Sequence, residues 1–195
     1  MSNWMENKLT IYGKENDLDR FKKSVTSTRI KRDFIKTDDL GDPVYQESKV
    51  ECMLDFNMIV PMPKEFEETE APSEMIDKKL KDELKKKYGH SDWYSWRNCN
   101  WGTKWNIDPE RLSFEIEHKK SYKLVYNFPT AWDAPKKIII AAAEKFPLLL
   151  FMLEYLEYVE SYEGILICQD NLVILDLSKN ADIAWRMINN KDDFL

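Results

Sequence analysis

A chain of 195 residues, 43% of them hydrophobic, is long enough to bury a full core and fits one domain, with or without a large insertion. Its net charge of -6 disfavours a broad basic surface, so direct nucleic-acid binding is not expected. The three cysteines are odd in number and lack CxxC spacing, and the N-terminal residues lack the pattern of a signal peptide. These features predict a cytoplasmic protein with reduced thiols.

The N-terminal quarter predicts a strand followed by a helix. Polar and apolar residues alternate over residues 7–12 and Gly13 follows, which is typical of a strand that ends at a turn. Helical spacing then predicts an amphipathic helix whose apolar side chains are Leu18, Phe21 and Val25. The polar stretch 27–48 is expected to be mostly loop, and strand content near Phe34 and Tyr45 is left open.

The middle of the chain predicts one more strand and then an insertion. Residues 50–60 form an apolar run that ends at Pro61 and Pro63, which favours a second strand. A four-residue apolar spacing predicts a solvated helix from about Pro72 to Tyr88, with a glycine at its C-cap. The next segment is expected to be helical through Trp96 and irregular from Asn98 to Thr103.

The C-terminal half predicts two hairpins around a helix. The first hairpin spans residues 112–128, and the helix after it is expected to be capped by Asp133 and to end at Pro147. Residues 148–158 fit a strand or a helix, and their aromatic content favours a strand. A second hairpin covers residues 164–175, and a short terminal helix is marked by Ile183, Met187 and Ile188.

This order of elements predicts a ferredoxin-like α+β fold, an antiparallel sheet with helices on one face. We expect a single domain over residues 1–195 with a tryptophan-rich, largely helical insertion at about 65–105. Because such a sheet leaves its second face open, the insertion is expected to cover that face.

Several segments together resemble one known family. They are Asn3-Trp4, residues 7–13, Val60-Pro61-Met62-Pro63, the block from Trp93 to Trp105, and Thr130-Ala131-Trp132 with Pro135. In these segments the chain resembles the Api92-like (YubB-type) ferredoxin-like proteins. The resemblance implies a ferredoxin-like fold and an origin in phages, conjugative plasmids or other bacterial mobile elements, and it brings no established activity, cofactor or catalytic residue. Met5 stands where many relatives carry a cysteine.

The candidate site is the tryptophan cluster, since four of the seven tryptophans fall between residues 93 and 105. Such a cluster either fills a core or anchors a ligand or partner, and we favour the core interpretation. If some of the rings stay exposed, the candidate binding residues are Trp93, Trp96, Arg97, Asn100, Trp101, Lys104 and Trp132. Trp132 precedes a helix, where it either completes that pocket or packs as a hydrophobic staple.

Other chemistry is poorly supported by the sequence. His90, Asp92 and Cys99 lack the repeated spacing of a zinc site, so no metal is expected. Nucleophile and phosphate-binding motifs are missing, which predicts no catalytic residue and no cofactor. We therefore expect an accessory protein of a mobile element that binds an unknown protein partner without catalysis. The alternatives are a small ligand- or nucleotide-binding protein or enzyme that uses the tryptophan pocket, and an acidic DNA mimic built on the runs Glu65–Glu70 and Glu154–Glu163.

Overall fold

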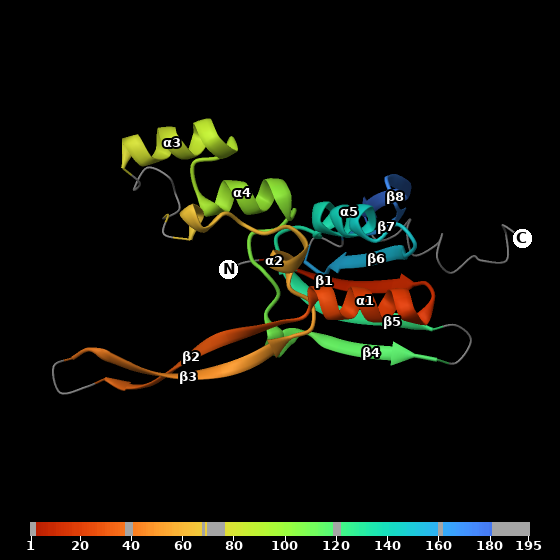
Figure 1. Ribbon diagram of the computed structural model, residues 1–195, viewed down its shortest axis with the longest axis horizontal. Helices are drawn as coiled ribbons and strands as arrows, with labels where there is room; N and C mark the ends of the chain where they lie inside the picture. Colours follow the sequence, from red (N-terminus) through yellow and green to blue (C-terminus); the bar gives the residue numbers. More distant parts are fainter. Residues whose placement is uncertain are drawn as a thin grey trace, which may run out of the picture.

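The computed structural model describes residues 3–37, 41–67, 69, 77–118, 122–159 and 162–180, and the predicted C-terminal helix lies outside these ranges. The chain is an α+β protein with a six-stranded antiparallel sheet in the order β4-β5-β1-β6-β7-β8 (Figure 1). The strands are β1 (Trp4–Tyr12), β4 (Ser113–Glu117), β5 (Lys123–Ala131), β6 (Leu150–Glu157), β7 (Tyr162–Gln169) and β8 (Leu172–Asn180). The predicted first strand, the two hairpins and the strand at 148–158 are confirmed.

Strand alternation gives the sheet two different faces. In β1, Met5, Leu9 and Ile11 are buried on one face, while Glu6 and Lys8 are exposed on the other. Leu9 pairs with Tyr126 of β5 and with Leu153 of β6, both of them buried, so the apolar set continues across the strands. The face that holds these residues is the core face, and the opposite one is called the open face below.

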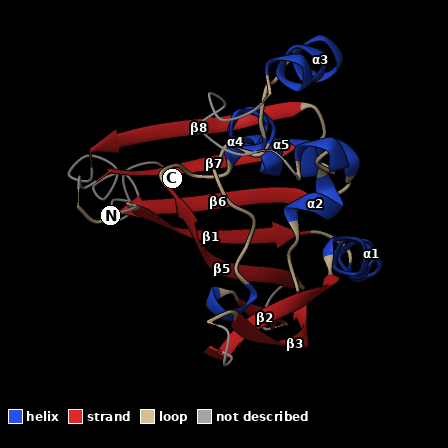
Figure 2. Cartoon of the chain, turned by 90° about the vertical axis from the view of Figure 1, so that its left-hand side faces the viewer, coloured by secondary structure: helices blue, strands red, loops and turns tan. Residues whose placement is uncertain are grey.

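Helices α1 (Glu15–Val25) and α5 (Lys136–Lys145) lie on the core face (Figure 2). The predicted apolar side chains of α1 are all buried, and α5 buries two isoleucines and two alanines, whose small size allows close approach to the sheet. Asp133 does not cap α5. The N-cap position is held by Pro135, whose side chain makes no capping bond, so that part of the prediction is wrong.

The predicted strand over residues 50–60 is wrong beyond Cys52. The chain instead forms the short helix α2 (Phe56–Ile59), because the Asp55 side chain accepts a hydrogen bond from the backbone nitrogen of Asn57 at 2.9 Å and starts a helical turn. Phe56 and Ile59 are buried in the core, so the segment has the apolar composition that also characterises a buried strand.

Two paired strands, β2 (Ser27–Thr37) and β3 (Pro43–Cys52), stand in place of the expected loop and form a long hairpin. Among the described strands they pair only with each other, and they extend away from the body (Figure 1). We call this hairpin the arm. Both of its faces are largely exposed, so its sequence lacks the polar and apolar alternation that identifies a half-buried strand.

The insertion contains the helices α3 (Lys78–Tyr88) and α4 (Trp93–Asn100) and lies beside α5 (Figure 1). Gly89 ends α3 with a φ of 77°, as predicted, and the expected start of α3 near Pro72 is outside the described residues. The insertion was expected to cover the open face, which is wrong for its central part. The Trp101 carbonyl accepts a hydrogen bond from the backbone nitrogen of Ile138 in α5, on the side of the core face. None of the described helices is long and apolar enough to span a membrane.

Candidate functional site

Helix α4 fixes the tryptophan cluster through its N-cap. Asp92 is buried, and its carboxylate accepts hydrogen bonds from the Ser95 backbone nitrogen at 2.7 Å and from the Ser91 hydroxyl at 2.9 Å. Because α4 starts at a fixed residue, Trp93 and Trp96 take defined directions on adjoining sides of the helix.

Two of the predicted site residues belong to the core. Trp96 is 6% exposed and Trp101 is 1% exposed, and their rings meet edge to face at 5.7 Å between centroids. The Trp101 indole nitrogen donates to the Val60 carbonyl at 2.9 Å, and its ring also packs against Phe56. These contacts join the insertion to α2 and bear out the core interpretation for both rings.

Arg97 is held between two indoles. Its guanidinium carbon lies 4.9 Å from the Trp93 ring centroid and 5.1 Å from that of Trp101, and Nε points at the sulfur of Met62. Burial lowers the pKa of Arg97, and the nearby carboxylate of Glu67 partly offsets this effect. The cation therefore helps to hold the insertion together by stacking.

The remaining predicted residues do not converge. The Asn100 amide donates to the Trp96 carbonyl at 2.8 Å, and the Lys104 ammonium lies 4.6 Å from the Trp105 ring centroid. Trp132 is 51% exposed at a φ of 73°, a conformation uncommon for residues other than glycine, so it is not a buried staple. Binding by Trp93, Lys104 or Trp132 stays a prediction.

A cavity of about 240 Å³ forms where the cluster meets the open face, and sequence reasoning missed it. Its lining includes Trp4, Trp105, Asn106 and Thr130, and the Arg111 guanidinium lies 4.0 Å from the Trp4 ring centroid. Only the pairing of β1 with β5 reveals that Trp4 lies near these residues. None of the seven predicted residues lines this cavity.

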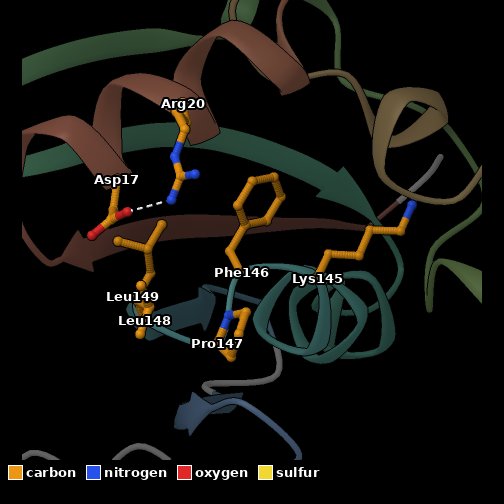
Figure 3. Close-up of a pocket in the computed structure, with 7 residues that line it drawn as sticks. All are labelled: Asp17, Arg20, Lys145, Phe146, Pro147, Leu148 and Leu149. Carbon is orange, nitrogen blue, oxygen red and sulfur yellow. Dashed lines mark hydrogen bonds and ion pairs between the residues drawn. The ribbon is translucent and has the colours of Figure 1, made fainter.

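A second cavity, of about 260 Å³, opens between α1 and the C-terminal end of α5 (Figure 3). Its lining residues are Asp17, Arg20, Lys145, Phe146, Pro147, Leu148 and Leu149. The charges at its rim already have partners, because Arg20 pairs with Asp17 at 2.6 Å and Lys145 donates to the Ile59 carbonyl. This cavity is also smaller than the roughly 300–1,000 Å³ usual for ligand sites.

The base of the arm is built around the buried carboxylate of Asp55. Arg29 of β2 donates to it at 2.7 and 2.9 Å, and Ser27 and Asn106 add two further hydrogen bonds. Although burial raises the pKa of Asp55, the hydrogen bonds from Arg29, Ser27 and Asn106 outweigh this and leave the pKa below its ordinary value. Lys31 pairs with Glu110 beside this network, so the arm is anchored to the body at its base.

No three histidine, cysteine or acidic side chains within the described ranges are grouped so that they could hold a metal ion. Glu154 and Glu157 lie on opposite faces of β6, so the acidic run at 154–163 does not present a single surface. Comparison of the chain with protein families, with curated proteins and with solved structures finds no match.

Proposed function

We infer that this chain is a non-catalytic protein-binding module that contacts its partner through the arm. One observation carries the proposal. The arm exposes four large apolar side chains, with Ile30 64% exposed, Phe34 59%, Ile35 54% and Tyr45 52%. A concentration of apolar side chains on one projecting element is a feature of interaction sites, whereas single exposed apolar residues are ordinary.

A purely structural role does not account for these side chains. A two-stranded hairpin has no second layer against which to bury them, and Phe34 and Tyr45 face each other across the strands with their ring centroids 6.2 Å apart. Fully burying four such side chains is worth about 6–12 kcal/mol, and since nearly half of each is already covered, a partner gains roughly half of that. The anchored base limits the entropy lost when the arm docks.

Charge favours a protein partner over a nucleic acid. The two strands of the arm carry five cationic and three anionic side chains. Arg29, Lys31 and Arg32 each pair with a carboxylate, which leaves Lys36 and Lys49 as the cations of the arm that form no ion pair within the described part of the chain. Nucleic-acid affinity depends on neutralising several phosphates, and two lysines supply little of it.

The alternatives draw on weaker observations. A small-ligand site around the tryptophan cluster is favoured by the cavity beside Trp4 and Trp105, where an aromatic wall meets polar groups. Its volume is below the usual range for such sites. DNA mimicry loses support because the acidic run of β6 alternates between two faces and Glu65 pairs with Lys87.

The ferredoxin-like fold class and the origin in a bacterial mobile element also belong to this proposal. Leaving out the arm and the insertion, the elements β1, α1, β4, β5, α5 and β6 follow one another, and their strands lie in the order β4-β5-β1-β6 with antiparallel neighbours. This order supports a ferredoxin-like core, a split βαβ arrangement. An origin in a mobile element rests on the resemblance of the quoted segments alone and stays a prediction.

Pull-down from the native host with tagged protein tests the role of the arm. The variants Phe34→Asp and Ile35→Asp place a charge on the arm, and Met58→Asp is the matched control on the body, where Met58 is exposed. We expect a partner captured by the wild type and by the control to be lost with both arm variants. A partner retained by both arm variants would remove the arm from the account.

A further inference from the structure

The outer edge of β5 is paired over only part of its length. Strand β4 pairs with β5 from Lys123 to Asn127, whereas β1 pairs with β5 as far as Ala131. The chain before β4 turns away from this line in the short helical turn Pro109–Arg111. Among the described strands, the last four positions of β5, residues 128–131, therefore have a neighbour on one side only. An unpaired stretch of strand edge can accept another extended chain.

Two residues of this stretch direct their backbone groups away from β1. Along an antiparallel strand, successive residues direct their N–H and C=O groups to opposite sides. The Trp132 nitrogen donates to the Asn3 carbonyl at 3.0 Å, so Trp132 is directed to β1, and Ala131 and Pro129 are directed outward. The outward Ala131 carbonyl accepts a hydrogen bond from the Thr103 hydroxyl at 3.0 Å. Within the described ranges, the Ala131 N–H and the Pro129 C=O have no such partner, although Ala131 is buried, and a buried N–H without a partner is costly.

The cavity beside Trp4 and Trp105 lies along the same stretch of β5, and we call it the edge cavity. Its lining combines Pro129, Thr130 and Ala131 with the two indoles, whose ring centroids are 5.7 Å apart. An apolar cavity of about 150 Å³ holds one benzene ring. At about 240 Å³, the edge cavity therefore has room for one larger ring, and it is too small for most whole ligands.

Charge around the edge cavity favours neither a cation nor an anion. The Lys104 ammonium and the Arg111 guanidinium lie 4.6 and 4.0 Å from the centroids of the two indole rings. The Asp108 carboxylate is part of the lining, and Glu6 is exposed on the neighbouring strand β1. Because charges of both signs are present, the indoles select the occupant, and an uncharged aromatic ring packs well against them.

We propose that the edge cavity binds an extended peptide segment of a partner protein. The segment continues the line of β4, antiparallel to β5, and places one uncharged aromatic side chain against Trp4 and Trp105. The N–H of that aromatic residue donates to the Pro129 carbonyl, and the Ala131 N–H donates to the carbonyl two residues earlier in the segment. Strand addition takes its affinity from main-chain hydrogen bonds and its specificity from side-chain pockets. The site rests on the sheet edge and the cavity, so it does not depend on the arm.

Peptide titrations of the full chain, followed by NMR, test the proposal. The probe is a capped seven-residue peptide of threonine and serine with one central tryptophan. We expect saturable shifts of the indole N–H signals of Trp4 and Trp105 and of the Ala131 amide, while the indole signal of the buried Trp96 stays in place. An alanine-centred peptide should bind about tenfold more weakly or worse. No shift of these signals, or equal shifts with both peptides, would overturn the proposal.

Further samples distinguish a bound strand from other occupants. Methylating the backbone nitrogen of the peptide's tryptophan removes its hydrogen bond to Pro129 and blocks the approach to β5, so the affinity should fall about tenfold. Methylating the next nitrogen, which faces away from β5, should leave the affinity within about twofold. Equal effects of the two methylations, or indole alone binding as tightly as the peptide, would overturn the bound strand.

A matched pair of protein variants tests the pocket. Trp105→Ala should weaken binding about tenfold, whereas Trp132→Ala should not, because Trp132 is exposed and does not line the edge cavity. Equal affinities of the two variants would overturn the proposal. If Trp105→Ala unfolds, the methylated peptides decide the matter, because they leave the protein unchanged.

Discussion

Replacing Trp101 by alanine tests whether the tryptophan cluster is mainly core. The side chain is 1% exposed, contacts the rings of Phe56 and Trp96, and donates its indole N–H to the Val60 carbonyl at 2.9 Å. Truncation removes the packing and leaves both a cavity and a partly buried carbonyl, that of Val60, without its donor.

The expected loss follows from these contacts. Burial and cavity terms for a large aromatic side chain replaced by alanine amount to about 3–5 kcal/mol. Trp101→Phe keeps most of the volume and loses the hydrogen bond, so it should cost about 1–2 kcal/mol. Trp132→Ala removes a half-exposed ring and should stay within about 0.5 kcal/mol.

Equilibrium unfolding in urea, followed by far-UV circular dichroism, measures these differences. With a slope of about 2 kcal/mol/M, Trp101→Ala should lower the midpoint by roughly 1.5–2.5 M, and Trp132→Ala should leave it nearly unchanged. A shift for Trp101→Ala below about 0.5 M, or equal shifts for the two alanine variants, would refute the assignment of Trp101 to the core.

Three further predictions concern the arm base, a strand glycine and the thiols. Because the pKa of Asp55 lies below its ordinary 3.8, its contribution is complete above that value and is lost as the pH falls through the lowered pKa. Asp55→Asn should therefore cost about 1–3 kcal/mol of stability at pH 7. In urea unfolding at successively lower pH, the difference in midpoint between the variant and the wild type should shrink. A difference that stays constant with pH would show that the Asp55 carboxylate is not the source of the lost stability. Gly164→Ala places a Cβ against the Tyr155 ring and the Leu177 carbonyl. It should lower the thermal midpoint more than Gly41→Ala, whose Cβ meets open space and whose cost is limited to backbone strain at a φ of 90°. The reverse order would contradict the close packing at Gly164. Burial raises the pKa of Cys168 to about 11 and also raises that of Cys52, whereas Cys99 is exposed. One thiol, Cys99, should therefore react with Ellman's reagent in the native protein, and all three should react in urea. Fast reaction of Cys52 or Cys168 in the native protein would contradict their burial.

The sequence predicts those elements whose residues face a core. Leu9, Phe21 and Ile138 carry the period of the strand or helix that buries them, and the hairpins around the sheet follow from the same alternation. The arm escaped prediction because a ribbon exposed on both faces has no such period. The segment after Cys52 misled for the opposite reason, since a short buried helix and a buried strand both appear as apolar runs.

The candidate site was predicted only in part. The density of tryptophans identified a cluster, and the core interpretation holds for Trp96 and Trp101. Sequence spacing could not place Trp4 beside Trp105, because that contact depends on where β1 lies in the sheet. The exposure of the apolar side chains of the arm could not be predicted for a related reason. Whether a side chain is buried depends on which layers pack against its strand, and the local sequence pattern does not contain this information.

Site-specific photo-crosslinking in the native host tests the central claim most directly. A photoreactive phenylalanine analogue is placed at Phe34 on the arm and, in separate samples, at Tyr94 and Trp132, which are exposed aromatic residues of the body. The account predicts one protein partner crosslinked from Phe34, and neither from Tyr94 nor from Trp132. A partner crosslinked from Tyr94 or Trp132 and not from Phe34 would contradict it and place the binding surface on the tryptophan cluster.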